Sequence, residues 1–308
     1  MPEPALETSG LTKRYGDVTA LADLDLRVER GEVFGFLGPN GAGKTTTIDL
    51  LLDFIRPTAG STAILGETVQ TDPDTAREPV GILPDGVDLW GRSTGRRHLE
   101  FALESTGGTA TPETLAERVG LEPEAMRRRT AEYSKGMKQR LAMAMALAGD
   151  PDVLILDEPS SGLDPHGIRT MQRIVREEAA AGTTVFFSSH ILGQVAAVCD
   201  RVGILDGGTL VAVDPIDRLR EAADVGSRLV CSLGAEPSVE LADLASVTAS
   251  SWSDGELAVT YTDPAAKARI LHRLVEDGCT VRDFSVEEPT LEDLFDVYTG
   301  NSTTEVPA

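Results

Sequence analysis

The chain has 308 residues, of which 41% are apolar and 25% are charged, so it can bury the core of one large domain or two smaller ones. These proportions exclude a largely disordered chain, and no apolar run approaches the roughly 18 residues that a membrane-spanning helix needs. The net charge of −22 argues against a nucleic-acid partner, because a polyanion would repel such a surface.

In chain order, the first 225 residues alternate short β-branched apolar runs with longer helical stretches, which predicts a mainly parallel β-sheet packed by helices. The runs Val33 to Leu37 and Val153 to Leu156 are predicted to be buried strands that end in polar residues. Ligands bind at such carboxyl ends in open α/β sheets. Residues 96 to 150 are predicted to be mostly helical, with the strongest propensity over Gln139 to Ala148.

The pattern of the sequence changes after Ala223. The predicted elements are a strand at Arg228 to Leu233, a helix at Val239 to Val247, a hairpin at Ser250 to Thr262 that turns at Asp254 and Gly255, a helix that follows Asp263 and stops at Gly278, and a strand at Thr280 to Val286. This order of elements is typical of a small ferredoxin-like domain. We therefore predict two domains, residues 1–225 and 226–308, with residues 216–223 able to belong to either.

A glycine-rich segment between a predicted strand and a predicted helix carries the sharpest chemical signal. It fits the pattern GxxxxGKS/T and consists of Gly38, Pro39, Asn40, Gly41, Ala42, Gly43, Lys44, Thr45 and Thr46. Glycines let such a loop wrap around phosphates with its N–H groups facing inward, and the helix N-terminus adds positive potential. Lys44 is expected to reach the β- and γ-phosphates of a nucleotide, and the Thr45 hydroxyl to ligate Mg²⁺.

Two carboxylates, Asp157 and Glu158, follow the second buried strand. Phosphate hydrolysis needs charge neutralisation and an oriented nucleophile, and this pair can supply both. Asp157 is expected to hold Mg²⁺ through water, and Glu158 to act as a general base or to position the attacking water. The alternative is an ordinary solvated strand end, which the phosphate loop upstream argues against.

A third segment gives the chain a family resemblance. Tyr133 to Arg140 resembles the signature sequence of ATP-binding cassette (ABC) proteins in its exporter form, and with the two motifs above it makes residues 6–222 similar to the ATPase subunit of an ABC transporter. Ser134 and the Gly136 N–H lie where a helix begins, which makes an anion site. The resemblance implies that this site meets the γ-phosphate held by a partner subunit, so that a homodimer sandwiches two ATP molecules. The alternative is a plain helix start.

Three further positions match this family by order and spacing. Tyr15 resembles the aromatic residue that stacks on adenine, although an isolated Tyr is more often a packing residue. His190 resembles the switch histidine that contacts the γ-phosphate, and the alternative is a structural histidine. Ser161 to Asp164 resembles the loop that links the two sites across the dimer, and the alternative is a simple Asp-containing turn.

One position departs from the family pattern. Asp85 stands where the family usually has Gln, and it is expected either to ligate Mg²⁺ as a charged oxygen ligand or to be a surface turn residue. The stretch from Val87 to Arg97, which contains Trp90, occupies the place where family members touch the coupling helix of the membrane subunit.

The resemblance implies an α/β fold: a P-loop NTPase core of the ABC type with a helical subdomain, followed by a small C-terminal α+β domain of ferredoxin-like form. It implies a subunit that hydrolyses ATP with Mg²⁺ and energises a separate membrane-spanning subunit, as an exporter of drugs or lipids or in copper-site maturation of nitrous oxide reductase. The C-terminal part, which ends in Glu288 to Phe295, resembles an accessory domain of such ATPases, and Leu291, Leu294, Phe295 and Tyr298 have the helical spacing of core residues. The alternative is a soluble ABC ATPase acting on DNA or the ribosome.

Cysteine usage and the start of the chain predict its compartment. Cys199, Cys231 and Cys279 are too few and too scattered for a disulfide framework or a zinc cluster, and no apolar leader follows Met1. We therefore expect a cytoplasmic protein, held peripherally on the inner face of the membrane by its partner.

The acidic surface generates a prediction about salt. Only 5 of the 28 cationic residues are Lys, a balance like that of proteins from salt-loving microbes. Since charges are screened over about 3 Å at 1 M salt but about 30 Å at 0.01 M, we expect the thermal midpoint to rise with KCl. Unfolding and ATP affinity measured across a KCl series, with and without residues 226–308, separate fold stability from nucleotide binding. A stability that stays flat or falls up to about 3 M KCl would contradict this expectation.

Overall fold

The computed structural model describes residues 3–223, 226–239, 241, 243–263, 265–287 and 297–298. The chain divides into two compact units, Met1–Ile216 and Asp217–Ala308, and the division falls at the first residue of α9 (Ile216–Ala223). The sequence-based domain boundary at residue 225 stays a prediction. Within the described ranges, no helix combines the length and the apolar character needed to cross a lipid bilayer.

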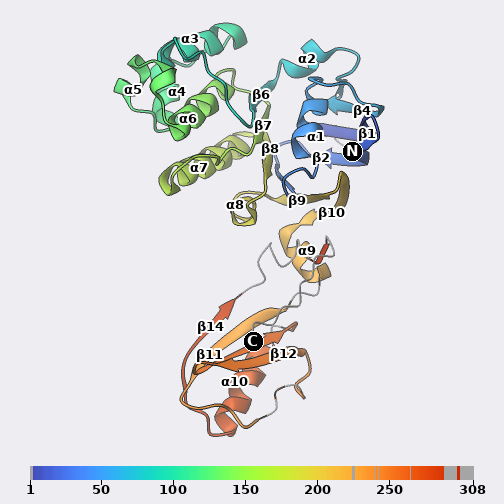
Figure 1. Cartoon of the computed structure of the whole chain (residues 1–308), viewed down its shortest axis with the longest axis vertical. Helices are drawn as coiled ribbons and strands as arrows, with labels where there is room; N and C mark the ends of the chain where they lie inside the picture. Colours follow the sequence, from blue (N-terminus) through green and yellow to red (C-terminus); the bar gives the residue numbers. More distant parts are fainter. Residues whose placement is uncertain are drawn as a thin grey trace. The chain divides into compact units, whose positions relative to one another are not determined.

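A six-stranded sheet with strand order β10-β9-β3-β8-β7-β6 forms the centre of the first unit (Figure 1). Its strands are β3 (Val33–Leu37), β6 (Val80–Leu83), β7 (Val153–Asp157), β8 (Thr184–Ser189), β9 (Arg201–Asp206) and β10 (Thr209–Pro215). Every neighbouring pair is parallel except β9 and β10. The prediction of a mainly parallel sheet is confirmed, and β3 and β7 are the two predicted buried strands.

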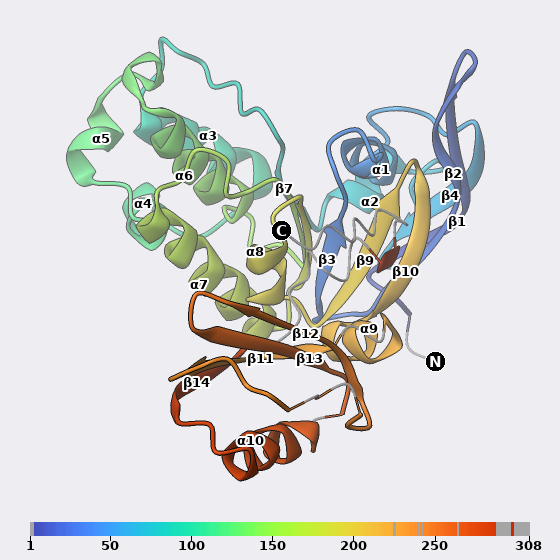
Figure 2. The same cartoon turned by 60° about the horizontal axis from the view of Figure 1, so that its bottom comes forward.

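Helices cover both faces of this sheet, which explains why its central strands are apolar throughout. On one face, the Phe186 ring lies 5.9 Å from that of Phe34 and 5.2 Å from that of Phe36, in a core shared with α1 (Lys44–Leu51). On the other face, Gly35 lies so close to α8 (Leu192–Ala196) that a Cβ would meet the Val195 side chain at 2.4 Å. Figure 2 shows α1 on one side of β3, and α8 with α7 (Pro165–Ala181) on the other.

A second, antiparallel sheet shares the core beneath α1, and the sequence analysis did not predict it. Its strand order is β2-β1-β4-β5, with β1 (Leu6–Tyr15), β2 (Val18–Val28), β4 (Ala59–Ile64) and β5 (Glu67–Thr68). Register shifts interrupt the pairing of β1 with β2, so the strands lack a regular alternation over their length. The short helix α2 (Pro73–Arg77) follows β5.

The region predicted to be mostly helical forms a helical subdomain, which is drawn in green in Figure 1. It contains α3 (Gly95–Thr106), α4 (Pro112–Arg118), α5 (Pro123–Arg127), a 3₁₀ turn (Thr130–Glu132) and α6 (Lys135–Ala146). The hydroxyl groups of Thr94, Thr111 and Ser134 accept hydrogen bonds from backbone N–H groups at the starts of α3, α4 and α6. These caps explain why the helices begin where they do.

The second unit has a four-stranded antiparallel sheet with order β12-β13-β11-β14. Its strands are β11 (Ser227–Leu233), β12 (Val247–Ser253), β13 (Glu256–Tyr261) and β14 (Val281–Glu287), and α10 (Ala266–Glu276) packs on one face. The strand order and the hairpin at Asp254 and Gly255, both with positive φ, agree with the ferredoxin-like prediction.

One predicted element of this unit is wrong. The described residues between 239 and 246 form bends and turns instead of the expected helix. Leu241 and Leu244 reach the core from a turn in which the Leu244 N–H donates to the Leu241 carbonyl at 3.0 Å, so their spacing reflects burial without a helix. The tail residues Leu291, Leu294 and Phe295 lie outside the described residues.

Candidate functional site

The glycine-rich loop joins the end of β3 to the start of α1, as its pattern predicted. Gly43 has a φ of 109°, and a Cβ at this position would meet the Ala20 carbonyl oxygen at 2.8 Å, so only glycine fits there. Lys44 is 6% exposed, and its Nζ donates to the carbonyl oxygens of Gly38 at 2.7 Å and Pro39 at 3.3 Å. The loop therefore wraps around the lysine ammonium at the N-terminus of α1.

Glu158 connects this loop to the ends of β7 and β8. Its Oε1 lies 3.4 Å from Lys44 Nζ, and its Oε2 lies 2.8 Å from Nδ1 of His190. Oε1 is buried and accepts no hydrogen bond from the described residues. The backbone of Glu158 has a φ of 47°, an unusual conformation for a residue with a side chain. The structure thus brings together three of the residues that the sequence singled out as catalytic.

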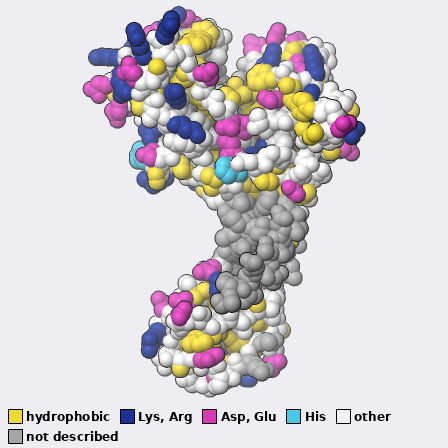
Figure 3. Space-filling view, viewed as in Figure 1, with side chains coloured by type: hydrophobic (Ala, Val, Ile, Leu, Met, Phe, Trp, Pro, Cys, Tyr) yellow, Lys and Arg dark blue, Asp and Glu magenta, His cyan; other side chains and the backbone are white. Residues whose placement is uncertain are grey.

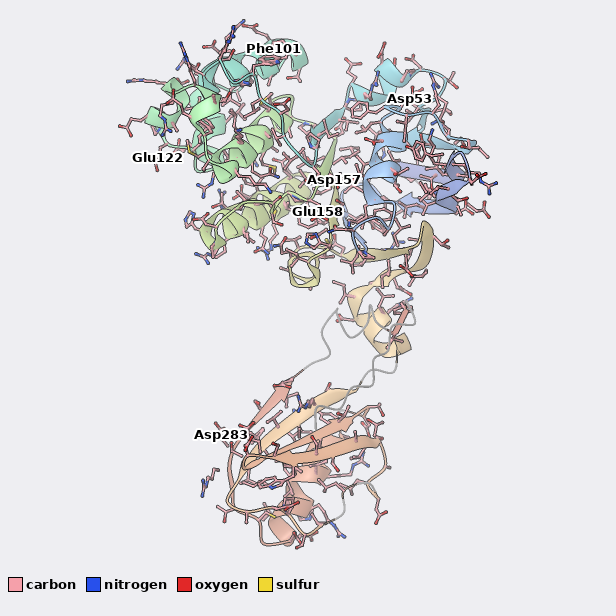
Figure 4. All side chains as sticks on the ribbon, in the orientation of Figure 1. Asp53, Phe101, Glu122, Asp157, Glu158 and Asp283 are labelled. Carbon is pink, nitrogen blue, oxygen red and sulfur yellow. The ribbon has the colours of Figure 1, made fainter. Side chains whose placement is uncertain are left out.

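Asp157 is buried beside Glu158 at the end of β7 (Figure 4). The hydroxyl of Thr45 donates to its Oδ2 at 3.0 Å, and the hydroxyl of Ser188 donates to its Oδ1. Burial raises the pKa of the Asp157 carboxyl, although these two hydrogen bonds act in the opposite direction; the nearby charges of Asp85 and Glu158 raise it further. A cation placed here would relieve this desolvated charge.

A cavity of about 240 Å³ opens onto these groups and contains most of the predicted loop. Its lining residues are Ala20, Pro39, Asn40, Gly41, Gly43, Lys44, Thr45, Thr46, Asp85 and Glu158. Asp85, exposed beyond the end of β6, therefore faces the same space as Thr45. The described residues contain no group of three or more His, Cys, Asp or Glu side chains that could form a metal cage. A hydroxyl with one or two carboxylates fits Mg²⁺, which keeps waters and phosphate oxygens as its other ligands.

Ser134 and Gly136 lie in a different cavity, of about 540 Å³, which is lined by residues of the helical subdomain and by Gly162 and Asp164. Ser134 caps α6, where its Oγ accepts from the Met137 N–H at 3.2 Å. A Cβ at Gly136 would meet the Gly162 carbonyl oxygen at 2.8 Å. The helix start and the Ser161 to Asp164 loop are therefore in contact, and the lining residues of this cavity are separate from those of the phosphate loop.

Tyr15 lies at the end of β1 and does not line the cavity of the phosphate loop. Its side chain is 51% exposed, and the Lys13 ammonium sits 4.9 Å from the ring centroid. One face of the ring is thus paired with a cation. Its assignment to adenine stacking stays a prediction.

Sequence reasoning missed two residues that organise these sites. Ser188 accepts from the Glu158 N–H at 3.2 Å as well as binding Asp157, and parallel pairing places it directly opposite Asp157. The sequence signal that could have found Ser188 was the change from apolar to polar residues at the end of β8. Arg140 donates to the Gly120 carbonyl oxygen at 2.7 Å and to Asp164 at 3.0 Å. Only the tertiary structure reveals these partners.

The buried carboxylate generates a prediction about stability. We expect Asp157→Asn to stabilise the nucleotide-free protein by about 1 kcal/mol, because an amide keeps the shape without a desolvated charge, its oxygen accepting from one hydroxyl and its NH2 group donating to the other. A raised pKa means that the folded state binds the proton more tightly, so the destabilisation by this charge develops as pH rises from the ordinary carboxyl pKa to the raised one and is absent below the ordinary value. The difference in unfolding free energy between Asp157→Asn and the parent should therefore shrink as pH is lowered.

Thermal unfolding at several pH values measures this difference, with Asp152→Asn as a control because Asp152 is exposed just before the same strand. The prediction would be contradicted if, at neutral pH, Asp157→Asn were less stable than the parent protein while Asp152→Asn had the same stability as the parent.

Comparison with known proteins identifies the fold. Residues 21–161 match the family model described as ABC transporter, and residues 216–297 match the model of the DrrA1-3-like ATP-binding protein C-terminal domain. The solved structure of an ATP binding subunit of an ABC transporter superposes with a TM-score of 0.66 at 31% identity, over 71% of this chain and 92% of that one. A dimeric ATP-binding cassette bound to ADP and Pi has a TM-score of 0.64 at 21% identity, which shows the shared fold.

Relatives of similar length match over nearly the whole chain. The daunorubicin resistance ATP-binding protein DrrA3 of Streptomyces coeruleorubidus is 35% identical, over 98% of both chains. The bacitracin transport ATP-binding protein BcrA of Bacillus licheniformis is 34% identical, over 97% of this chain and 98% of its own. The expected fold and family are confirmed, and the cavity of Lys44 and Thr45, with Asp157 bound to Thr45, fits the ATP and Mg²⁺ that this family uses. The chain belongs to the ATP-binding subunits of ABC transporters and has a C-terminal domain of the DrrA1-3-like type.

Proposed function

We propose that this chain hydrolyses ATP on the inner face of the cell membrane and energises a membrane-spanning exporter subunit. The observation that carries the proposal is the convergence of Lys44, Thr45 and Glu158 on one cavity, where His190 holds Glu158 and Asp157 holds Thr45. The similarity to the daunorubicin resistance and bacitracin transport proteins over nearly the whole chain supports an exporter of drug-like or antibiotic compounds. The match of residues 216–297 to the DrrA1-3-like domain supports the same class.

Each residue of the cavity has a distinct task in this proposal. Lys44 leaves the carbonyl oxygens of Gly38 and Pro39 to bind the β- and γ-phosphates, and the loop N–H groups hold the phosphate oxygens. Thr45, Asp157 and Asp85 hold Mg²⁺, which when bound neutralises charge on the phosphates. Their hydroxyl and carboxylate oxygens are the ligand types that this ion prefers.

Glu158 is the residue that handles the attacking water. Its Oε1 lies 3.4 Å from the Lys44 ammonium and accepts no hydrogen bond from the described residues, so it can accept one from a water next to the phosphate loop. His190 holds the other oxygen at 2.8 Å and so fixes the orientation of the carboxylate. A group that accepts the proton of water must lie within hydrogen-bond reach of it, which this placement permits.

The second cavity supports a shared site in a homodimer. Ser134 and Gly136 form an anion site whose lining residues are separate from those around Lys44, so a chain does not use both for one nucleotide. A partner copy that presents its own Ser134 and Gly136 to the γ-phosphate would complete each site. Two ATP molecules are then held between the subunits, and Tyr15 stacks on adenine with the face of its ring that Lys13 leaves free.

The role of Glu158 generates a prediction about turnover. We expect Glu158→Gln to keep ATP binding and to lower turnover by about 10²-fold or more, because an amide cannot take a proton from water. ATP should then accumulate in a stable dimer. ATPase assays and size-exclusion chromatography measure both effects, with Glu177→Gln, at an exposed carboxylate on α7, as the control. Near-parental hydrolysis by Glu158→Gln would exclude this residue as the catalytic carboxylate.

The separate anion site generates a prediction about dimerisation. We expect Ser134→Arg to bind ATP as a monomer and to fail to form the ATP-dependent dimer, because a bulky cation fills a site used only by the partner's nucleotide. Ser134→Ala is the matched control, since it loses the same helix cap, which costs about 1 kcal/mol, without blocking the site. Mixing Ser134→Arg with Lys44→Ala should leave at most one working site per dimer. Normal dimerisation of Ser134→Arg by itself would overturn the shared-site arrangement.

A further inference from the structure

Gln139 on α6 is a buried polar side chain that lies apart from the residues lining the cavities of Lys44 and Ser134. Figure 3 shows Lys and Arg side chains gathered and protruding at the upper left, over the helical subdomain, whereas Gln139 from the same subdomain is only 5% exposed. A buried amide needs hydrogen-bond partners inside the protein, because leaving it without them is costly. The partners of Gln139 therefore indicate what this side chain holds in place.

The amide of Gln139 holds the backbone next to the carboxylate of Glu158. Its Nε2 donates to the Pro159 carbonyl oxygen at 3.1 Å and, at the longer distance of 3.5 Å, to the Glu158 carbonyl oxygen. A carbonyl oxygen only accepts hydrogen bonds, so the NH2 group and not the oxygen of the amide must face this segment. These two carbonyls belong to the peptide units on either side of Pro159. One side chain of the helical subdomain therefore fixes two successive peptide units at the end of β7.

The backbone of Glu158 needs this support, because its φ of 47° is unfavourable for a residue with a side chain. Such a conformation persists only where the surrounding structure fixes it. The Glu158 N–H donates to the Ser188 hydroxyl at 3.2 Å, and the Glu158 carbonyl oxygen accepts from the Ser161 N–H at 3.0 Å. Gln139 adds a contact from α6. Together these bonds set the direction in which the Glu158 side chain leaves the backbone toward Lys44.

The packing around Gln139 leaves almost no free space. The cavity beside it has a volume of about 10 Å³ and is lined mostly by apolar side chains, among them Leu83, Met143 and Ile174. Such a volume has room for about one water molecule at most. Bulk water therefore cannot replace the amide if its hydrogen bonds to the Pro159 and Glu158 carbonyls are lost.

The helix that carries Gln139 begins at the anion site of Ser134 and Gly136. Gln139 lies one turn after Gly136, on the same side of the helix. A single turn of α-helix is stiff and can transmit a displacement from one of its residues to the next. α6 therefore connects the site proposed to meet the partner's γ-phosphate with the backbone of Glu158 in its own chain.

We propose that Gln139 is a positioning residue for ATP hydrolysis, whose amide keeps the Glu158 carboxylate within reach of the attacking water. It acts through the carbonyls of Glu158 and Pro159 and touches neither nucleotide nor metal. Its loss should therefore lower turnover and leave ATP binding intact. Because the anion site lies on the same helix, the partner's γ-phosphate can influence the position of Glu158 through this amide. The inference rests on the proposed ATPase function and deepens it.

The test compares two substitutions of Gln139 in the full chain by steady-state ATPase kinetics, ATP affinity and thermal unfolding. Gln139→Met keeps the length of the side chain without an N–H group. Gln139→His keeps a donor, because its ring Nε2 lies as many bonds from Cβ as the amide nitrogen of Gln does. Since a misplacement of about 1 Å can cost up to about 10²-fold in rate, Gln139→Met should lower kcat about 10-fold and change KM less than about 2-fold. Gln139→His should recover kcat to within about 3-fold of the parent.

Gln70 provides a matched control for the loss of an amide. Its Nε2 donates to the Thr62 hydroxyl at 2.8 Å, and its Oε1 accepts from the Thr62 N–H at 3.0 Å, within the antiparallel sheet and the turn that follows it. Gln70→Met removes these hydrogen bonds far from Glu158 in the fold, so kcat should stay within about 2-fold of the parent. Equal losses of kcat in Gln70→Met and Gln139→Met would overturn the positioning role.

A double-mutant cycle with Glu158→Gln separates positioning from general damage. Where the carboxylate is already absent, adding Gln139→Met should change the residual single-turnover rate less than about 2-fold. A further loss as large as that in the parent background, a parental kcat for Gln139→Met, or equal loss in Gln139→Met and Gln139→His would overturn the inference. These results leave the ATPase assignment standing as long as Glu158→Gln is impaired. Parental turnover by Glu158→Gln would overturn both.

Discussion

The buried ion pair between Lys44 and Glu158 is the interaction on which the nucleotide site depends. Both side chains are almost fully buried, and burying two charges is costly unless they are paired and hydrogen-bonded. Lys44 meets that condition through the carbonyl oxygens of the loop, whereas one Glu158 oxygen lacks a hydrogen-bond donor in the described chain. Phosphate and water can therefore supply hydrogen bonds to groups that the described residues leave without them.

The parallel register of the central sheet puts the parts of the site next to each other. β7 and β8 pair so that Asp157 lies opposite Ser188, and β3 pairs with β8 up to the residue before the phosphate loop. A shift of one residue in this pairing would turn each side chain to the other face of the sheet. The packed phenylalanines on one face and the tight approach of α8 to Gly35 on the other hold that register. The same packing therefore stabilises the core and positions the side chains of the nucleotide site.

Charge is distributed unevenly, and the distribution agrees with the tasks proposed for each region. The site concentrates carboxylates around one lysine, which suits a metal ion and its phosphates, whereas residues 90–146 of the helical region contain more Lys and Arg than Asp and Glu. Arg140, which binds Asp164 and the Gly120 carbonyl oxygen, joins that subdomain to the loop near the second anion site. Contacts made by the helical subdomain can thereby influence the half-site that a partner subunit uses.

The sequence by itself determined the phosphate loop, the carboxylate pair and the strands that carry them, because short local patterns dictate backbone conformation there. It also indicated a ferredoxin-like second unit, but it predicted a helix at residues 239–247 where leucine spacing reflects burial in turns. Only the tertiary structure decided that Glu158 reaches both Lys44 and His190, and that Ser188 binds Asp157. These partners lie about 30 to 110 residues apart in the chain, and their contact depends on sheet register and packing, which no local pattern encodes.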